Sequence, residues 1–302
     1  MINVLLTGAT GLVGGEVARL LGTASNEADL AGRCRLHALV RDRQRAQSLS
    51  TAGVTLIEAD LDDLASLAPA VEQMDAVLLV SPATPEMVRQ QGNLVDALAN
   101  AAKASGKSAH VVKISGFMTA LDSASRSGRW HAAIEAHIES AGLPATLLRP
   151  PFFMQNLLRL QPHSVQGERL AVPLQHGRIA MVDARDLAAV AARGLLDRAQ
   201  AGARYLVTGP RAVGFDEVAR AMSTVLERPV RHDPISPEQM AERLRALGTP
   251  AWRIEVVLEF YAGFEAGLAA PLSDTVQRVT GRAPLDLEAF LIAHRDVLRA
   301  AC

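Results

Sequence analysis

The first residues that could do chemistry form a glycine-rich segment, Thr7-Gly8-Ala9-Thr10-Gly11-Leu12-Val13-Gly14, which follows a short apolar run. In a strand–turn–helix unit, Gly8 would permit the tight turn, Gly11 a close backbone approach to a ligand, and Gly14 the packing of the helix. A helix that begins here offers free N–H groups and the positive end of its dipole to an anion. We therefore expect this segment to bind the pyrophosphate of a dinucleotide, and the alternative is a glycine turn without a ligand. The expected contacts are Gly8, Thr10, Gly11, Leu12, Val13 and Gly14.

The end of the next apolar run carries arginine where many dinucleotide-binding proteins have a carboxylate. A carboxylate would hold the ribose diol of NAD, whereas Arg41 would pair with the 2′-phosphate of NADP. The sequence therefore predicts a preference for NADP(H) over NAD(H). Arg41 lies 33 residues after Gly8, and the polar segment 23–34 is expected to absorb this long spacing as a loop. Two alternatives stay open: Arg41, Arg43 and Arg45 form an ordinary solvated helix start, or Asp42 serves as an N-cap or faces the diol itself.

Short apolar runs alternate with helical patterns through the first half of the chain. Runs that are nearly continuously apolar are typical of parallel strands covered on both faces, and they fall at residues 4–6, 36–40, 54–57, 76–80, 111–114 and 145–148. The clearest helical patterns lie between them at residues 85–103 and 129–141. Repeated strand–helix units predict an α/β fold, with a doubly wound parallel sheet of the Rossmann type.

This alternation ends at Pro150 and Pro151. Residues 152–180 show no regular pattern, a helical pattern resumes at 183–196, and a strand-like run follows at 205–207. The remainder is mostly helical and is interrupted by prolines. We therefore predict an NADP-binding domain that holds residues 1–151 and 181–209, and a smaller, mostly helical C-terminal substrate lobe that holds residues 152–180 and 210–302.

The composition restricts the classes of partner. A net charge of −1 gives no electrostatic footprint for nucleic acid, and no apolar run reaches the 18 residues that a membrane span needs. The chain enters a strand-like run at once, so we expect no signal sequence and a cytoplasmic location. Its two cysteines, Cys34 and Cys302, are expected to be reduced thiols, and no metal site is predicted. The expected partner is a small-molecule substrate, with monomer and homodimer both open.

Several further motifs follow the glycine segment in a fixed order. They include the Leu-Val-Arg-Asp stretch at 39–42 and the segments 58–62, 79–82, 147–156, 182–186 and 280–284, with Phe290 beyond. In this order the motifs resemble the NmrA-like branch of the atypical short-chain dehydrogenases/reductases. The resemblance covers essentially the whole chain.

The resemblance implies cofactor contacts beyond the glycine segment. It assigns the adenine to Asp60 and Leu61, the pyrophosphate and nicotinamide ribose to Ser81 and Pro82, and the nicotinamide with its carboxamide to Ser115, Pro151 and Phe152. An ordinary structural role is the alternative for each. Asp60 would then be a turn or cap residue, Pro82 a strand terminator, and Phe152 a core contact.

The helix after the fifth predicted strand departs from this pattern. Related reductases place Tyr-x-x-x-Lys there, whereas alignment on Glu135 puts Ser127 and His131 at those positions. The whole chain has only two tyrosines and three lysines, and neither type lies on this helix. His131 and Glu135 share a helix face, so His131 could donate a proton or hydrogen-bond the nicotinamide ribose. The alternative is a surface histidine paired with Glu135.

We therefore predict an NADPH-dependent oxidoreductase that passes hydride to an electrophilic small molecule without a Tyr-Lys dyad. Quinones, iminiums, enones and cationic dyes suit such a site because they need little proton assistance. The alternatives are a non-catalytic NADP-binding redox sensor of the NmrA type, and an isomerase or dehydratase that uses the cofactor transiently. The substrate pocket is expected between the two lobes, and its expected walls are Trp130, Phe152, Phe153, Met154 and the helical segment 252–264.

Overall fold

A computed structural model gives the fold and describes residues 1–22, 29–51, 53–159, 165–166 and 168–300. Within that part of the chain, seven strands form one sheet in the order β3-β2-β1-β4-β5-β6-β9, and every neighbouring pair is parallel. The strands are β1 (Ile2–Leu6), β2 (Cys34–Val40), β3 (Thr55–Glu58), β4 (Ala76–Leu79), β5 (His110–Ile114), β6 (Ala145–Arg149) and β9 (Arg204–Leu206). The chain changes direction across the sheet between β1 and β4, and ligands of such sheets bind outside the carboxyl ends at this point.

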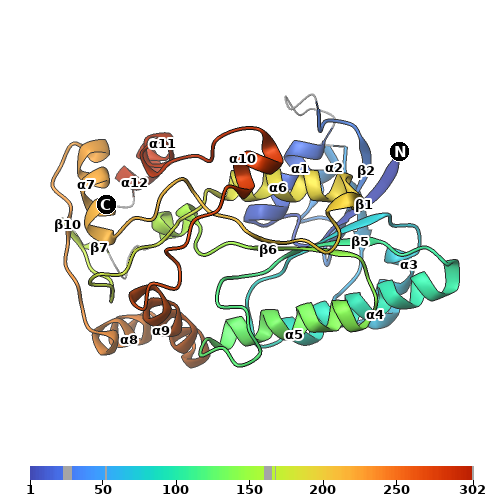
Figure 1. Cartoon of the computed structure of the whole chain (residues 1–302), viewed down its shortest axis with the longest axis horizontal. Helices are drawn as coiled ribbons and strands as arrows, with labels where there is room; N and C mark the ends of the chain where they lie inside the picture. Colours follow the sequence, from blue (N-terminus) through green and yellow to red (C-terminus); the bar gives the residue numbers. More distant parts are fainter. Residues whose placement is uncertain (23–28, 52, 160–164, 167, 301–302) are drawn as a thin grey trace.

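Helices cover both faces of the sheet (Figure 1). One layer holds α1 (Leu12–Leu21), α6 (Ala184–Leu196) and α10 (Thr275–Thr280), and the other holds α3 (Leu64–Val71), α4 (Met87–Ser105) and α5 (Arg126–Ser140). The short helix α2 (Gln47–Thr51) lies between β2 and β3 in the sequence.

The two layers explain why the strands are continuously apolar. In β1, Val4 and Leu6 pack into the core beside α1 and α6, whereas Leu5 packs into the core beside α4. In β4, Leu78 faces the first of these cores and Val77 the second. Because successive side chains point to opposite faces, a strand between two helical layers must be apolar at every position.

The predicted Rossmann-type fold and the predicted strands are confirmed, with ends that differ by one to two residues. The long predicted loop is confirmed only in part. Residues 29–33 are turns and bends, but Cys34 is already the first residue of β2, and residues 23–28 lie outside the described part. Cys34 is buried, and burial raises the pKa of its thiol to about 11. Cys302 also lies outside the described residues.

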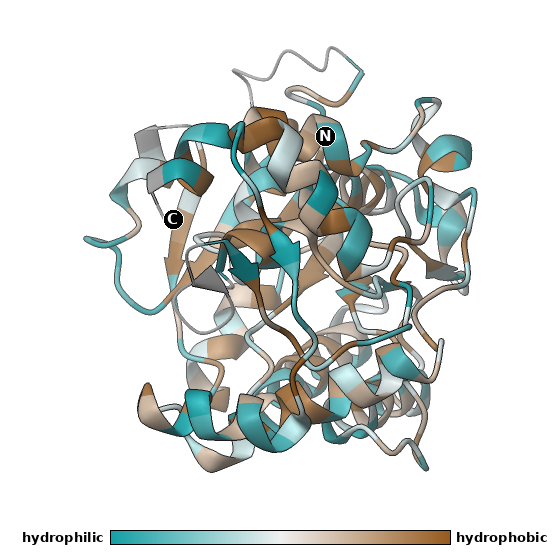
Figure 2. Ribbon diagram, turned by 90° about the vertical axis from the view of Figure 1, so that its left-hand side faces the viewer, coloured by the Kyte–Doolittle hydropathy of each residue, from teal (hydrophilic) through white to brown (hydrophobic). Residues whose placement is uncertain are grey.

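The helical C-terminal part has a core of its own. The bounds of its helices are α7 (Phe215–Leu226), α8 (Pro237–Ala246), α9 (Ala251–Glu265), α11 (Leu287–Ala293) and α12 (Arg295–Ala300). Phe215, Phe264 and Phe290 lie in that core, which is separate from the two cores of the sheet. The helices at the surface carry hydrophilic and hydrophobic residues in alternation (Figure 2), as amphipathic packing requires. The predicted domain boundaries stay a prediction.

Residues 152–180 contain more structure than their sequence indicates. They hold a 3-10 helix, η1 (Met154–Arg159), and the two short strands β7 (Val165–Gln166) and β8 (Arg169–Leu170). A second 3-10 helix, η2 (Arg198–Gln200), follows α6. β8 pairs with β10 (Arg231–His232) from beyond α7. The expectation of an irregular segment was therefore wrong at η1, β7 and β8, because such short elements leave no local periodicity, whereas residues 171–178 are irregular as expected.

Candidate functional site

The glycine segment forms the turn that its sequence predicts. Gly8 has a φ of +58°, and its carbonyl oxygen accepts a hydrogen bond of 2.8 Å from the Gly11 amide. A Cβ on Gly14 would overlap that same carbonyl oxygen. Helix α1 begins at Leu12 directly after Gly11, and no side chain caps its N-terminus. The free amides and the exposed Thr10 and Gly11 therefore fit a bound pyrophosphate.

Thr7, which was not among the predicted contacts, ties this loop to the end of β4. Its Oγ1 lies 2.9 Å from the carbonyl oxygen of Leu78 and 2.8 Å from that of Val80, and it accepts a 2.8 Å hydrogen bond from the Val80 amide. The predicted contacts Ser81 and Pro82 follow directly. The glycine loop and this segment therefore lie side by side at the carboxyl edge of the sheet. A polar residue at the end of a buried strand was the signal that could have identified Thr7.

Arg41 follows β2 at the same edge. It is exposed and has no hydrogen bond or ion pair to any residue that the structure describes. Asp42 instead caps the local turn, because its Oδ1 accepts hydrogen bonds from the amides of Gln44 at 2.8 Å and Arg45 at 3.2 Å. Helix α2 begins at Gln47, after exposed turns that hold Arg43 and Arg45, so Arg41 itself lies outside the helix. Asp62 interacts electrostatically with Arg41 but forms its own ion pair with Arg89, so the Arg41 guanidinium can still bind an anion.

The predicted adenine contacts lie after β3. The Asp60 Oδ1 accepts a 3.0 Å hydrogen bond from the Asp62 amide, so Asp60 has the turn role that was the alternative. The Leu61 carbonyl oxygen accepts a 2.8 Å bond from the Asn93 side chain of α4. These bonds fix the backbone of the segment, and both side chains are half-buried at the carboxyl edge.

His131 does not pair with Glu135, so that alternative was wrong. The imidazole on α5 faces β5, where its Nδ1 lies 3.3 Å from the Nζ of Lys113. Its ring packs against Gly116, where an added Cβ would lie 3.0 Å from the ring Cδ2. Burial, and then the nearby Lys113 and Arg149, hold the pKa of His131 well below its usual range. The imidazole is therefore neutral at physiological pH.

Glu135 has other partners. Its Oε1 accepts a 2.6 Å hydrogen bond from the Ser115 hydroxyl and a 3.1 Å bond from Arg149 Nε, and its Oε2 pairs with Arg149 Nη2. All three side chains come from neighbouring elements: β6, α5 and the end of β5. Ser115 was predicted to lie near the nicotinamide. It is buried at this edge, and its hydroxyl proton is engaged by Glu135.

Lys113 is the functional candidate that sequence reasoning missed. It is fully buried in β5, where its Nζ donates to Gln91 Oε1 at 3.0 Å and to the Ile114 carbonyl oxygen at 3.2 Å. Burial lowers its pKa to about 7, against the opposing effect of Glu135. A lysine inside an apolar strand was the available signal, because a charge there is costly unless it has a use or a partner.

The family follows from comparison with known proteins. The sequence profile of the NmrA-like family matches residues 2–291. The chain belongs to the NmrA-like family. The resemblance that the motifs predicted is therefore confirmed.

This NmrA-like chain has relatives of similar length. An NAD(P)H azoreductase of Xenophilus azovorans is 35% identical over 298 residues, which cover 99% of this chain and 100% of the relative. A (4-alkanoyl-5-oxo-2,5-dihydrofuran-3-yl)methyl phosphate reductase of Streptomyces griseus is 32% identical over 284 residues, covering 92% and 93%. The solved structure of an NADPH-dependent quinone oxidoreductase of Escherichia coli in complex with NADPH is 25% identical, with a TM-score of 0.84, and covers 97% of this chain and 99% of that one.

Aromatic side chains lie where this NmrA-like chain passes from the sheet to the helical part. Phe117, just after β5, stacks on Phe264 of α9 at 5.1 Å, and Phe152 meets Phe264 edge-on at 5.6 Å. Trp130 of α5 lies 6.4 Å from Trp252 of α9.

The other predicted walls differ in their burial. Phe153 packs against the first core of the sheet, and Met154 is buried in the core of the helical part. Pro151, predicted to lie beside the carboxamide, is also buried. Trp130 and Phe152 are half-buried, so these two keep surface for a ligand.

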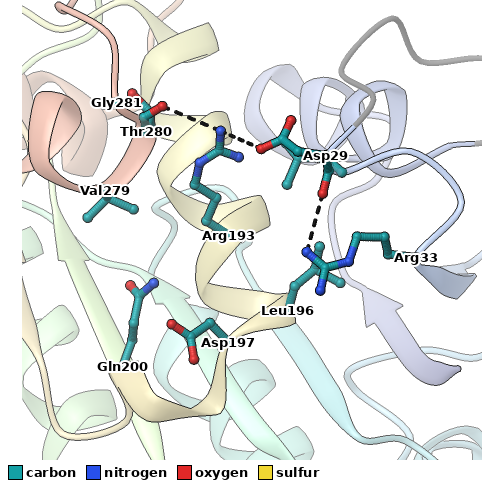
Figure 3. Close-up of a pocket in the computed structure, with 10 residues that line it drawn as sticks. Asp29, Arg33, Arg193, Leu196, Asp197, Gln200, Val279, Thr280 and Gly281 are labelled. Atoms are coloured by element: carbon teal, nitrogen blue, oxygen red, sulfur yellow. Dashed lines mark hydrogen bonds and ion pairs between the residues drawn. The ribbon is translucent and has the colours of Figure 1, made fainter.

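A hollow of about 550 Å³ lies elsewhere on the molecule (Figure 3). Arg33, which precedes β2, and Arg193, near the end of α6, line it, so it belongs to the amino edge of the sheet. Asp29 engages both arginines, through a 2.8 Å ion pair with Arg193 and a 3.3 Å hydrogen bond from Arg33 to its carbonyl oxygen. This hollow is therefore separate from the glycine loop.

The described residues show neither a metal-binding cluster nor a membrane span. Among them, no group of three or more His, Cys, Asp or Glu side chains is arranged to hold a metal ion. In the same part of the chain, no helix has the length and apolarity to cross a membrane.

Proposed function

We propose that this protein is an NADPH-dependent reductase that passes a hydride to an electrophilic small molecule. The observation that carries the proposal is the glycine loop, where the uncapped α1 N-terminus faces the carboxyl edge of the sheet. The similarity to proteins named azoreductase, phosphate reductase and quinone oxidoreductase supports the reaction class. When bound, the nicotinamide supplies the hydride, and the protein supplies binding, orientation and protons.

Arg41 supports NADP(H) over NAD(H). Its guanidinium is exposed, makes no direct ion pair with a described residue although the charge of Asp62 lies near enough to interact with it, and follows β2 at the edge that binds the adenosine half in such folds. A 2′-phosphate would give it a charge-assisted, bidentate partner. Asp42 does not compete for the ribose diol, because its carboxylate caps the adjacent turn.

The acceptor is inferred from the helix that holds the dyad in related reductases. Ser127 is buried there, and the ring of the neutral His131 packs against Gly116 at the carboxyl edge. A site without a tyrosine acid suits acceptors that stabilise the incoming electron pair themselves: quinones, iminiums, conjugated enones and dyes, including azo dyes. The aromatic residues Phe117, Phe152 and Phe264 would orient a flat acceptor and exclude water.

We place the substrate between residues 1–151 with 181–209 on one side and residues 152–180 with 210–302 on the other. The aromatic contacts that Phe117, after β5, and Trp130, on α5, make with α9 lie where these two parts meet. Side chains of Trp130 and Phe152 are the proposed walls.

One experiment tests the function. Purified protein is first titrated with NADPH to establish binding, and it is then mixed with NADPH and a panel of quinones, iminiums, enones and azo dyes. Steady loss of nicotinamide absorbance with at least one acceptor class is expected. Tight binding with no oxidation by any acceptor would instead favour an NADP-binding sensor and refute the reductase.

A further inference from the structure

A chain of hydrogen bonds runs through the protein from the end of β4 to α5. Ser81 Oγ accepts a 2.8 Å bond from the Gln91 side-chain amide, and Gln91 Oε1 accepts a 3.0 Å bond from Lys113 Nζ. The same Nζ lies 3.3 Å from His131 Nδ1. Gln91 and Lys113 are fully buried, so this chain is shielded from water between its two ends.

The three partners of Lys113 match the three protons of an ammonium group. Gln91 Oε1 and the Ile114 carbonyl oxygen each accept one bond, and because an ammonium has three donors and no acceptor, His131 Nδ1 can only accept the third. If Nδ1 of His131 accepts, then the proton of the neutral imidazole sits on Nε2. The charged lysine therefore selects one tautomer of His131.

The Nε2 of His131 is free to act as a donor. No residue that the structure describes hydrogen-bonds to it. The ring edge lies at Gly116, where an added Cβ would be 3.3 Å from Nε2, just past the carboxyl end of β5. This is the edge of the sheet that carries the glycine loop. The free donor therefore faces the side on which hydride transfer would occur.

We propose that Lys113 is a positioning residue that acts through His131 and is the source of its proton. The inference rests on the reductase function proposed above. As the Nε2–H bond breaks and its proton moves to the reduced acceptor, Nδ1 takes a proton from Lys113 Nζ. The imidazole stays neutral, the ammonium becomes an amine, and the acceptor gains one proton beside its hydride. Between turnovers the amine regains a proton from water along the same path.

The electrostatics around Lys113 suit this role. Burial lowers its pKa to about 7, so proton release at neutral pH costs little free energy. Glu135 is the opposing influence, because its negative charge favours the ammonium. Arg149, from β6, is paired with Glu135, and Gln91 and Ser81 on the other side are uncharged. Lys113 is thus protonated below about pH 7 and loses its proton above that pH.

The pKa of Lys113 can be measured by NMR without any substrate. Because the chain has only three lysines, their side-chain signals can be told apart. In protein labelled with 13C-lysine and 15N-histidine, one lysine resonance should titrate near pH 7 and vanish in Lys113→Met. The ring nitrogen signals of His131, assigned with His131→Gln, should show the imidazole changing tautomer over the same pH range in the wild type. Lys103→Met is the matched control, and the transition of Lys113 near pH 7 should persist in that variant. A Lys113 signal that titrates near the ordinary lysine pKa of 10.5 would overturn the proposal.

Turnover measurements test the proton relay separately from the proposed reductase function. An iminium becomes a neutral amine when it accepts a hydride and needs no proton, whereas an enone must gain a hydride and a proton. In the wild type, the ratio of enone to iminium turnover should fall about tenfold per pH unit above pH 7. Lys113→Met, and also Lys113→Arg, which keeps the charge but not a releasable proton, should lower that ratio at pH 6.5 at least tenfold. An unchanged ratio in both variants overturns the relay while the reductase stands, and NADPH binding without reduction of any acceptor in the panel refutes the reductase itself.

Discussion

Gly14 packs so tightly against Gly8 that the carbonyl oxygen of Gly8 fills the space where a Cβ at position 14 would lie. The neighbouring Gly15 differs, because a Cβ there would make an ordinary 3.4 Å contact with the Ala9 carbonyl oxygen. Both glycines lie in the first turns of α1. The missing side chain at position 14 therefore sets the distance between α1 and the turn that precedes it.

Gly14→Ala should move α1 away from the turn and weaken the dinucleotide site. We expect NADPH affinity to fall at least tenfold and the melting temperature to drop, because the clash is with backbone atoms that cannot rotate away. Gly15→Ala is the matched control. It should bind NADPH normally and gain up to about 1 kcal/mol of stability from helix propensity. Titration calorimetry and thermal melts measure both effects, and equal behaviour of the two variants would contradict this account.

Arg41→Ala should discriminate between the two nicotinamide cofactors. Loss of a charge-assisted hydrogen bond to the 2′-phosphate should weaken NADPH binding about tenfold to a hundredfold and leave NADH binding unchanged. Arg45→Ala removes a neighbouring exposed arginine that pairs with Asp42, and it should affect neither cofactor. Dissociation constants for both cofactors with the three proteins decide the matter. If Arg41→Ala weakens NADH as much as NADPH, Arg41 does not bind the 2′-phosphate.

The fold could be predicted because its elements are long and locally patterned. The strands show continuous apolar runs, and α6 begins directly after Asp183, whose side chain caps it by accepting from the Arg185 amide. The short strands β7, β8 and β10 could not be predicted, because strands of two residues leave no periodic pattern and β10 pairs with β8 from a distant part of the chain, Arg231 beside Arg169. Helix α5 also begins three residues before its predicted start at 129, where Ser125 supplies the cap.

The candidate site, like the fold, could be predicted from the sequence only in part. The glycine loop is contiguous in sequence, so its turn and its uncapped helix could be anticipated. The surroundings of His131 could not, because they come from three separate elements. Gln91 lies on α4, Lys113 on β5 and His131 on α5. The spacing of His131 and Glu135 on one helix suggested a pair, but Arg149 and Ser115 bind Glu135 across the strand ends instead.

The buried Lys113 should make folding stability depend on pH. Burial lowers its pKa from the ordinary lysine value of 10.5 to about 7 in the folded protein. Between these values the unfolded chain binds the proton and the folded chain does not, so stability rises with pH. Relative to Lys113→Met, the wild-type free energy of unfolding should increase by up to about 1.4 kcal/mol per pH unit from pH 7 to 10. Urea titrations at several pH values test this, and parallel curves for the two proteins would contradict it.

Glu135 should set the pH at which Lys113 loses its proton. Its carboxylate favours the ammonium, so Glu135→Gln should lower the pKa of Lys113 further and move its NMR transition below pH 7. The same change leaves Arg149 without its ion partner, and the free energy of unfolding should fall by about 1–3 kcal/mol. Glu139→Gln is the matched control, since Glu139 lies on the same helix but pairs with Arg204 at the surface. That control should alter neither quantity, because an exposed pair contributes little and its charge is screened. A Lys113 transition that stays at the same pH in Glu135→Gln would show that Glu135 does not act on the lysine.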